Sequence, residues 1–175
     1  MSDSLKHRVH DTLRDIPDFP KPGIVFKDIT PVLADGELFR EITASFADRY
    51  RGKVEQIVGV ESRGFIFGAA LANELGIGLT LVRKPGKLPA DTVGVDYALE
   101  YGTDRLEVHV DALSPGQPVV IIDDLLATGG TAAATVELIE SCGAEILEVA
   151  FLIELGFLSG RDRLKGQEVY SMLTF

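Results

Sequence analysis

The chain has 175 residues, enough to bury one sizeable hydrophobic core but too few to divide comfortably into two, so we expect a single domain. Its 27 Asp and Glu outnumber its 17 Lys and Arg, and the net charge of -10 opposes broad contact with nucleic acid or with an anionic membrane surface. Cys142 is the only cysteine, which excludes an internal disulfide, and the N-terminal residues are too charged for a signal peptide, so we expect a cytoplasmic protein.

The N-terminal part of the chain is predicted to contain two helices separated by an irregular connection. Apolar residues recur at helical spacing from Leu5 to Ile16 and again from Leu38 to Tyr50, which predicts two amphipathic helices. Between them, PDFPKPG at residues 17–23 holds three prolines and a glycine and cannot continue a helix. We therefore expect a loop there.

From Val54 onward, short apolar runs alternate with helical segments, which is the pattern of parallel β-α-β units. The predicted strands share an unbroken run of core-forming residues and lie at 56–60, 79–83, 119–122, 148–153 and 168–173. Two intervening helices end at Gly76 and Gly143, where glycine suits a left-handed cap. The sequence therefore predicts an α/β fold, with a doubly wound and mostly parallel sheet flanked by helices.

One segment of the α/β part interrupts this pattern. Residues 84–96, KPGKLPADTVGVD, contain few core-forming residues and many turn formers, so we expect a flexible loop, which we extend to residues 84–105. The overlapping stretch ALEYGTDRLEVHV is predicted to form two short strands around Gly102. The three histidines have no ligand spacing with one another or with Cys142, so no zinc or nucleophilic site is predicted.

The clearest functional pattern is VVIIDDLLATGGT at residues 119–131, where an apolar strand leads into two carboxylates and a Thr-Gly-Gly-Thr segment opens a helix. A helix N-terminus at the carboxyl end of a parallel strand offers unpaired N–H groups to a phosphate, and glycine lets the backbone approach it closely. Asp123 and Asp124 would repel each other unless a ribose diol or a magnesium ion lay beside them. The alternative is a solvated acidic pair followed by a glycine-rich turn.

This run resembles the phosphoribosyl pyrophosphate motif of type I phosphoribosyltransferases, and DDLLATGGT is close to the form carried by the adenine phosphoribosyltransferase family. The resemblance implies a type I phosphoribosyltransferase fold in one domain over residues 1–175, with residues 1–35 forming a helix and a small hood. It also implies that Asp123 and Asp124 hold the ribose hydroxyls. The residues implied to surround the 5′-phosphate are Ala127, Thr128, Gly129, Gly130 and Thr131.

Two further segments resemble the pyrophosphate-binding parts of the same family. ESRGF follows the first predicted strand of the parallel sheet, and RKPGKLP concentrates three cations in an otherwise acidic chain. The resemblance implies a pyrophosphate site made of Ser62, Arg63, Arg83, Lys84 and Lys87. Lys87 would act within its own subunit or across a dimer interface. The alternatives are an arginine that caps its own turn and a solvated run of charges.

The segment FPKPGIVFKDITP at residues 19–31 resembles the family's base-recognition segment. An adenine site must accept a hydrogen bond from the exocyclic amine, which a backbone carbonyl can do. The resemblance implies that Val25 and Lys27 present backbone groups to adenine and that Phe26 packs on the ring, while a role for the Lys27 side chain stays open. Leu155, within the family-like FLIELGFLSGR, would cover the other face of the base; the alternative for Phe26 and Leu155 is ordinary core.

The resemblance also implies a reaction and its requirements. Glu100 corresponds to the family's acid/base candidate near the imidazole ring of the base, and Arg63 is expected to be catalytic by taking leaving-group charge; the alternative for Glu100 is a solvent-facing carboxylate. The implied reaction transfers the 5-phosphoribosyl group from phosphoribosyl pyrophosphate to adenine, giving AMP and pyrophosphate in purine salvage. Magnesium would be bound mainly through phosphoribosyl pyrophosphate, with no direct protein ligand expected. The resemblance implies a homodimer with small-molecule substrates, and no nucleic-acid or membrane partner.

Two other functions are compatible with parts of the sequence. A phosphoribosyltransferase for xanthine, guanine or orotate would share the TGGT loop, although the base-recognition segment favours adenine. A non-catalytic regulator that senses phosphoribosyl pyrophosphate could reuse the fold, but it would need a DNA-binding extension or a basic face, and the sequence indicates neither.

Overall fold

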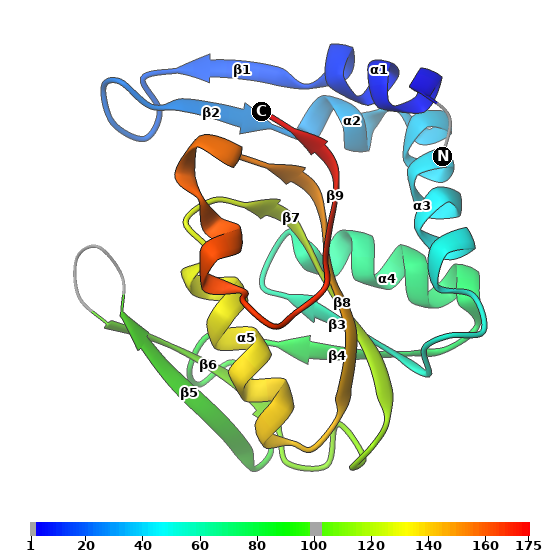
Figure 1. The fold of residues 1–175 in the computed structure, drawn as a ribbon, viewed down its shortest axis with the longest axis vertical. Helices are drawn as coiled ribbons and strands as arrows, with labels where there is room; N and C mark the ends of the chain where they lie inside the picture. Colours follow the sequence, from blue (N-terminus) through cyan, green and yellow to red (C-terminus); the bar gives the residue numbers. More distant parts are fainter. Residues whose placement is uncertain (1–2, 99–102) are drawn as a thin grey trace. The chain divides into compact units, whose positions relative to one another are not determined.

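The computed structural model describes residues 3–98 and 103–175, and the chain forms two compact units, residues 1–49 and 50–175 (Figure 1). The helices and strands of the first unit follow one another along the chain: α1 (Asp3–Thr12), β1 (Arg14–Pro17), β2 (Val25–Asp28), α2 (Thr30–Ala34) and α3 (Gly36–Tyr50). Among the described residues, no helix combines the length and hydrophobicity needed to span a bilayer. That the chain forms a single domain stays a prediction.

The first unit contains an antiparallel ribbon that was not predicted. The expected helix from Leu5 to Ile16 is wrong at its C-terminal end, because α1 stops at Thr12 and Ile16 pairs with Phe26 across β1 and β2. Helical spacing continued through Ile16, but pairing with a distant strand decided the conformation. The turn that follows β1 lies within the proline-rich segment, as expected.

The side chain of Asp28 links the ribbon to the start of α2. One of its oxygens accepts the Thr30 amide at 2.9 Å, and the other accepts a hydrogen bond from Arg14 at 3.0 Å. The Thr30 amide and the Arg14 guanidinium together lower the pKa of Asp28 to about 2. The ribbon and the helix are thus joined by one ionised carboxylate.

The second unit contains the predicted parallel sheet. Five strands run in the order β4-β3-β7-β8-β9, and every neighbouring pair is parallel. Their bounds are β3 (Gln56–Val60), β4 (Gly78–Val82), β7 (Pro118–Leu126), β8 (Glu145–Glu154) and β9 (Val169–Thr174). Each of the five predicted strands is confirmed, and β7 extends four residues beyond its apolar run to include both aspartates.

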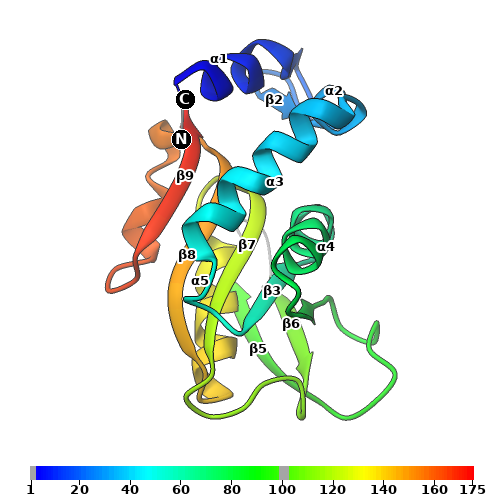
Figure 2. The ribbon, with the colours of Figure 1, turned by 90° about the vertical axis from the view of Figure 1, so that its right-hand side faces the viewer.

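Helices α4 (Gly64–Leu75) and α5 (Gly130–Ser141) cover opposite faces of this sheet, as Figures 1 and 2 show. Because side chains alternate along a strand, neighbouring residues mark the two faces. Ile121 belongs to the core cluster that contains the buried residues of α5, whereas Ile122 and Gly59 lie against Gly68 of α4. The two helix ends predicted at Gly76 and Gly143 are confirmed, with φ values of 68° and 79° in the left-handed region.

A separate antiparallel hairpin formed by β5 (Thr92–Ala98) and β6 (Thr103–His109) packs on α5 (Figure 1). Of the two strands predicted around Gly102, the second is confirmed as β6, whereas the first falls on residues 98–101, which lie largely outside the described residues. β5 begins at Thr92, inside the segment expected to be a loop. Pairing such as Val95 with Leu106 forms this strand despite its turn-forming residues. The flexibility of residues 84–105 stays a prediction.

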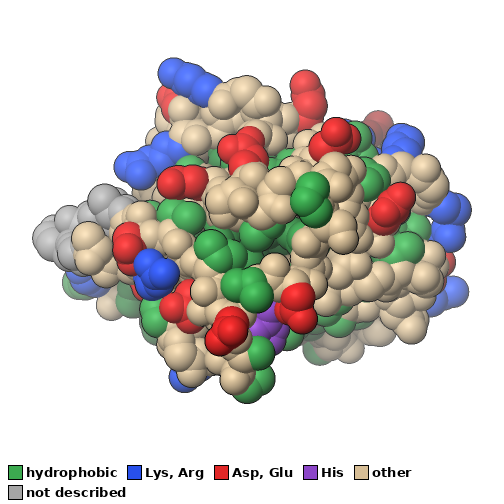
Figure 3. Space-filling view, turned by 90° about the horizontal axis from the view of Figure 1, so that it is seen from below, with side chains coloured by type: hydrophobic (Ala, Val, Ile, Leu, Met, Phe, Trp, Pro, Cys, Tyr) green, Lys and Arg blue, Asp and Glu red, His purple; other side chains and the backbone are tan. Residues whose placement is uncertain are grey.

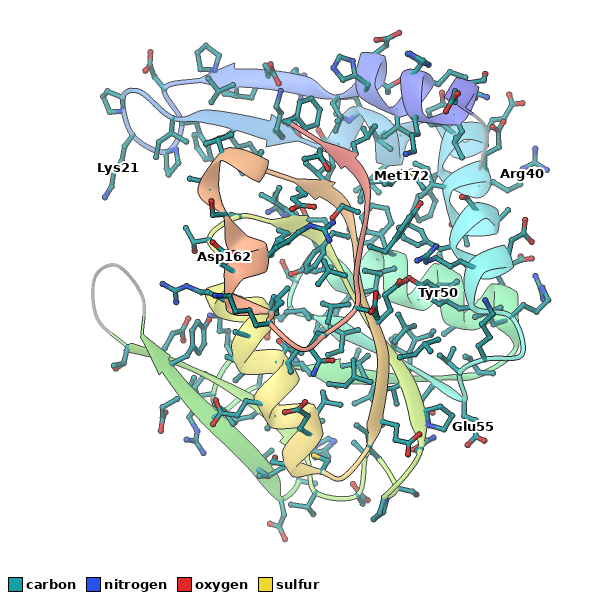
Figure 4. All side chains as sticks on the ribbon, viewed as in Figure 1. Lys21, Arg40, Tyr50, Glu55, Asp162 and Met172 are labelled. Atoms are coloured by element: carbon teal, nitrogen blue, oxygen red, sulfur yellow. The ribbon has the colours of Figure 1, made fainter. Side chains whose placement is uncertain are left out.

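A buried polar contact ties the start of the second unit to its sheet. Tyr50, labelled in Figure 4, is almost fully buried, and its hydroxyl donates to Glu148 Oε2 on β8 at 2.6 Å. Glu148 is itself 8% exposed. A buried carboxylate requires such a donor, so this contact is part of what fixes the residues that precede β3.

The start of α4 packs so closely on the end of β7 that only glycine fits. A Cβ added to Gly64 would lie 2.7 Å from the Ile122 carbonyl oxygen and 2.9 Å from Asp123 Oδ1. We predict that Gly64→Ala lowers the free energy of unfolding by about 1–3 kcal/mol, because a backbone carbonyl cannot move aside easily. Urea unfolding followed by circular dichroism measures this change.

Gly36→Ala is the matched control, since Gly36 also begins a helix but has open space around its Cβ position. Its free energy of unfolding should change by no more than about 0.5 kcal/mol. Equal effects of the two substitutions would contradict the close packing of α4 on β7.

Candidate functional site

A cavity of about 340 Å³ lies where β3 and β7 end at their carboxyl edge. Three segments form its walls: residues 61–63 after β3, residues 123–132 at the end of β7 and the start of α5, and Phe151 on β8. The carboxyl edge is where parallel α/β sheets bind ligands. The cavity therefore contains the whole of the DDLLATGGT run and the Ser62-Arg63 pair.

Asp123 and Asp124 form one wall of the cavity together with Arg63. Asp124 is 3% exposed, and its Oδ2 lies 2.9 Å from Arg63 Nε, although among the described residues this oxygen has no partner in hydrogen-bonding geometry. Asp123 Oδ1 accepts the Asp124 amide at 2.8 Å. Of the two adjacent carboxylates, Asp124 is therefore the one paired with the guanidinium at the edge of the sheet.

The surroundings of the acid pair favour the neutral form of both groups. Burial raises the pKa of Asp123 well above its ordinary value, and the charge of Asp124 raises it further. Burial also raises the pKa of Asp124, while the nearby Arg63 opposes that rise. The pair therefore lies where an additional positive charge or a set of hydroxyl donors would stabilise the ionised form.

The loop from Ala127 to Gly129 joins β7 to α5 and is held by a second glycine. Gly129 caps α5 with a φ of 81°, and a Cβ there would collide with the Gly160 carbonyl oxygen. A Cβ on Gly160 would in turn collide with the Ala127 carbonyl oxygen. Sequence reasoning missed Gly160, although it lies inside the family-like FLIELGFLSGR segment.

The first turn of α5 lines the cavity beside this loop. Its first helical hydrogen bond runs from the Ala133 amide to the Gly129 carbonyl, at 2.9 Å. The amides of the first turn, from Gly130 to Ala132, therefore have no acceptor within the helix. Such amides at a helix N-terminus suit an anion.

Ser62 and Arg63 are placed at the same edge by the end of β3. The peptide bond between Glu61 and Ser62 is cis, and Arg63 occupies the N-cap position of α4. The Ser62 and Arg63 carbonyls accept the amides of Phe65 and Ile66, at 3.2 Å each. Both predicted residues thus line the cavity that holds the acid pair.

Glu61, which sequence reasoning missed, organises the third predicted segment. It receives Arg83 through two nitrogens, at 3.1 and 3.2 Å, and the Lys84 amide at 2.9 Å. Arg83 also donates to the Lys87 carbonyl at 3.1 Å. Burial raises the pKa of Glu61, but Arg83 and the Lys84 amide lower it more, so the net shift is downward.

The two lysines of this segment differ in their surroundings. Lys84 Nζ contacts Asp104 and lies 3.1 Å from the Tyr97 hydroxyl, so it is held by the β5–β6 hairpin. Lys87 is exposed. Neither Tyr97 nor Asp104 was predicted as a functional residue, and no local pattern marks them.

The predicted adenine residues lie in different units. Val25, Phe26 and Lys27 are on β2 of the first unit, where Phe26 meets Phe19 edge-on at 5.3 Å and Lys27 Nζ lies 2.7 Å from Asp15. Leu155 follows β8 in the second unit, and its amide donates to the Leu126 carbonyl at 2.9 Å. Glu100, the predicted acid/base residue, lies outside the described residues.

Comparison with known proteins places this geometry in context. A family model for the phosphoribosyl transferase domain matches residues 30–171. A protein named adenine phosphoribosyltransferase from Syntrophotalea carbinolica is 62% identical over 168 residues, which cover 95% of this chain and 98% of that protein.

Solved structures give the same result. Adenine phosphoribosyltransferase from Thermoanaerobacter pseudethanolicus superimposes with a TM-score of 0.93 at 51% identity, over 97% of this chain and 99% of that one. The enzyme of the same name from Saccharomyces cerevisiae, solved with adenine and an imino-altritol bisphosphate, gives 0.94 at 40% identity, over 98% and 100% of the two chains. The type I phosphoribosyltransferase fold expected from the sequence is thereby confirmed.

The raised pKa of Asp123 means that its ionised form costs stability at neutral pH. An acid whose pKa is raised by folding binds its proton more tightly in the folded state, so stability falls as pH rises from its ordinary pKa through the raised value. We predict that Asp123→Asn, which keeps an acceptor for the Asp124 amide, increases the free energy of unfolding at neutral pH by roughly 1–3 kcal/mol. The gain should shrink toward low pH in urea titrations.

Asp91→Asn removes one charge from an exposed aspartate of the same unit and serves as the control. Its free energy of unfolding at neutral pH should stay within about 0.5 kcal/mol of that of the parent chain. A loss of stability in Asp123→Asn at neutral pH would contradict the inferred shift.

Proposed function

Because the chain belongs to the adenine phosphoribosyltransferase family, we propose that the cavity at the carboxyl edge of the sheet binds phosphoribosyl pyrophosphate. Enzymes of this family transfer the 5-phosphoribosyl group to adenine, giving AMP and pyrophosphate, which is a step of purine salvage. The observation that carries the proposal is the meeting, in one cavity, of an acid pair, an arginine and a helix N-terminus. These groups match a pentose diol and its phosphates.

The ribose 5-phosphate is proposed to lie along the end of β7 and the start of α5. Asp123 and Asp124 would accept the ribose hydroxyls, which stabilises the ionised carboxylates that burial disfavours. The 5′-phosphate would be enclosed by the loop and first helical turn, whose members are Ala127, Thr128, Gly129, Gly130 and Thr131. Gly129 and Gly160 keep this loop compact.

The pyrophosphate group is proposed to face the cations of the other two segments. Ser62 and Arg63 both line the cavity wall. The guanidinium of Arg63 and the hydroxyl of Ser62 can each donate a hydrogen bond to a phosphate oxygen. Arg83, Lys84 and Lys87 follow β4, with Arg83 and the Lys84 amide fixed by Glu61. Lys87 is proposed to contact the pyrophosphate either in its own subunit or across a dimer interface.

Magnesium is used with phosphoribosyl pyrophosphate in this family, and the residues present fit it. Two carboxylates line the cavity, and the buried Asp124 Oδ2 lacks an aligned hydrogen-bond donor among the described residues. We propose that the ion is bound mainly through oxygens of the substrate, with the acid pair nearby. When bound, it neutralises charge on the departing pyrophosphate.

The reaction is substitution at the anomeric carbon. The bond from this carbon to the pyrophosphate oxygen breaks, the bond to the purine nitrogen forms, and the electron pair leaves with pyrophosphate. Arg63 and the lysines stabilise the leaving charge, while the acid pair and the phosphate loop fix the ribose. Glu100 is proposed to accept the proton that adenine loses from its imidazole ring.

Adenine is proposed to bind at β2 and Leu155. Val25 and Lys27 are two residues apart on one strand, so their backbone groups point the same way and can together read one edge of a base. Phe26 and Leu155 would cover its faces. The ion pair of Lys27 with Asp15 supports the backbone, rather than the side chain, as the contact.

A homodimer and a cytoplasmic location are proposed from the family resemblance. Figure 3 shows hydrophobic side chains gathered near the middle of one face, with Asp and Glu around them. In the second unit, Ile66, Leu81 and Val110 are large apolar residues that are 39%, 37% and 60% exposed. Sedimentation equilibrium with and without substrates measures the oligomeric state.

Base selectivity tests the proposed function directly. Adenine, hypoxanthine, guanine, xanthine and orotate are each supplied with phosphoribosyl pyrophosphate and magnesium, and pyrophosphate release is measured. We predict turnover with adenine, and a kcat/KM at least about 100-fold lower with each other base, because a site built to accept the exocyclic amine leaves a carbonyl unpaired. Absence of turnover with every base would favour a sensor of phosphoribosyl pyrophosphate.

Glu100→Gln tests the acid/base proposal. Loss of the proton acceptor should lower kcat by about 100-fold or more, because the carboxylate accepts the proton in the transition state. The KM of both substrates should change little. Steady-state kinetics over a range of pH separates this effect from binding. An unchanged kcat would show that Glu100 is not the base.

A further inference from the structure

The β5–β6 hairpin places two polar side chains next to each other on one face. Tyr97 lies directly opposite Asp104 in the antiparallel register. The neighbouring pair, Asp96 and Arg105, points to the other face because side chains alternate along a strand, and these two form their own ion pair at 3.0 Å. The hairpin therefore has a Tyr-Asp face and a separate Asp-Arg face.

The Tyr-Asp face holds the ammonium group of Lys84. Asp104 Oδ2 is in direct contact with Lys84 Nζ, and the Tyr97 hydroxyl lies 3.1 Å from the same nitrogen and 3.2 Å from Asp104 Oδ2. The Tyr97 hydroxyl also lies 3.4 Å from Thr131 Oγ1, at the start of α5 in the wall of the cavity. One phenol oxygen thus links the lysine to the phosphate loop.

The donors and acceptors of this group can be assigned from chemistry. An ammonium group only donates, so the Tyr97 oxygen accepts from Lys84 and has a single proton left to give. Asp104 Oδ2 accepts both Lys84 and the Tyr97 hydroxyl, and its other oxygen accepts the Arg105 amide at 2.8 Å. Because the only Tyr97 hydroxyl proton goes to this carboxylate, the Thr131 hydroxyl is the donor in its 3.4 Å contact with Tyr97.

The electrostatics keep Lys84 charged and in place. Burial lowers the pKa of Lys84, but the hydrogen bonds with Asp104 and Tyr97 raise it more, and the net shift is upward. The pKa of Asp104 is lowered, and the hydrogen bond from Lys84 is the largest cause of that shift. A lysine side chain fixed before its ligand arrives loses less conformational freedom on binding.

We propose that Tyr97 and Asp104 are positioning residues that hold the Lys84 ammonium group beside the phosphate loop for binding of phosphoribosyl pyrophosphate. This inference rests on the proposed function, which assigns the cavity to that substrate and Lys84 to its pyrophosphate group. The two residues act through Lys84 and need not touch the substrate. Their loss should therefore affect binding of phosphoribosyl pyrophosphate rather than binding of adenine.

Tyr97→Phe keeps the ring and removes the hydroxyl. We expect the KM for phosphoribosyl pyrophosphate to rise roughly tenfold, the usual scale of a hydrogen bond to a charged group, while the KM for adenine changes less than about twofold. In a Lys84→Met background, the same substitution should raise the KM for phosphoribosyl pyrophosphate by less than about twofold, because its effect passes through the lysine. Steady-state kinetics of the four chains completes this cycle.

Asp104→Asn and Asp96→Asn form a matched pair on the same hairpin. Each removes one negative charge, but only Asp104 contacts Lys84. We expect Asp104→Asn to raise the KM for phosphoribosyl pyrophosphate severalfold and Asp96→Asn to leave it within about twofold. Urea unfolding of each variant shows whether the fold is kept.

Three outcomes would overturn the inference. An equal effect of Tyr97→Phe with and without Lys84 would show that it acts through the fold, and equal effects of the two Asp substitutions would show a general charge effect. A lower KM in Asp104→Asn would show that Asp104 competes with the substrate for Lys84. Direct titration with phosphoribosyl pyrophosphate and magnesium measures the same comparison as a Kd, without requiring turnover. Failure of the parent chain to turn over adenine would therefore count against the proposed function alone.

Discussion

The buried acid pair at the end of β7 is the constraint on which the rest of the site depends. Asp123 and Asp124 are placed at the carboxyl edge by an apolar strand that cannot shift without moving the core. Burial disfavours the ionised forms of both, the charge of Asp124 adds to the penalty at Asp123, and Arg63 offsets only part of that cost. Under the proposed function, a ligand that brings hydroxyl donors and a metal ion would remove the remaining penalty, so the feature that lowers stability would favour binding.

Each neighbouring segment brings what a polyanion needs without crowding the acid pair. Gly64 lets α4 begin in contact with the β7 backbone, which sets Arg63 against Asp124. Gly129 and Gly160 let the loop from Ala127 to Gly129 pack closely against the segment after β8. Glu61 fixes the cationic segment after β4 through Arg83, so charges that would repel one another are held by an acid of the same cavity wall.

Much of this could be predicted from sequence, because the strands of a parallel sheet are buried on both faces and are encoded as continuous apolar runs. The lining of the cavity by the TGGT loop and by Ser62-Arg63 follows from the same rule, since both come directly after such runs. Ile16 shows the limit: its helical spacing was real, but pairing with Phe26 made it a strand. Gly160, Tyr97 and Asp104 act through contacts with residues distant in sequence, and no local pattern encodes those contacts.

The net charge of -10 conflicts with the proposed substrate, which carries several phosphates, only if the charge is averaged over the whole surface. Arg83 and Lys84 are each paired with an acid, Glu61 and Asp104, so the cations are pre-positioned while their long-range field is largely cancelled. Recognition under the proposed function then depends on the short-range geometry of these held cations. Under the proposed function, such a chain would bind a small polyanion that fits the cavity, whereas extended polyanions such as nucleic acids bind through a long-range field and many exposed cations.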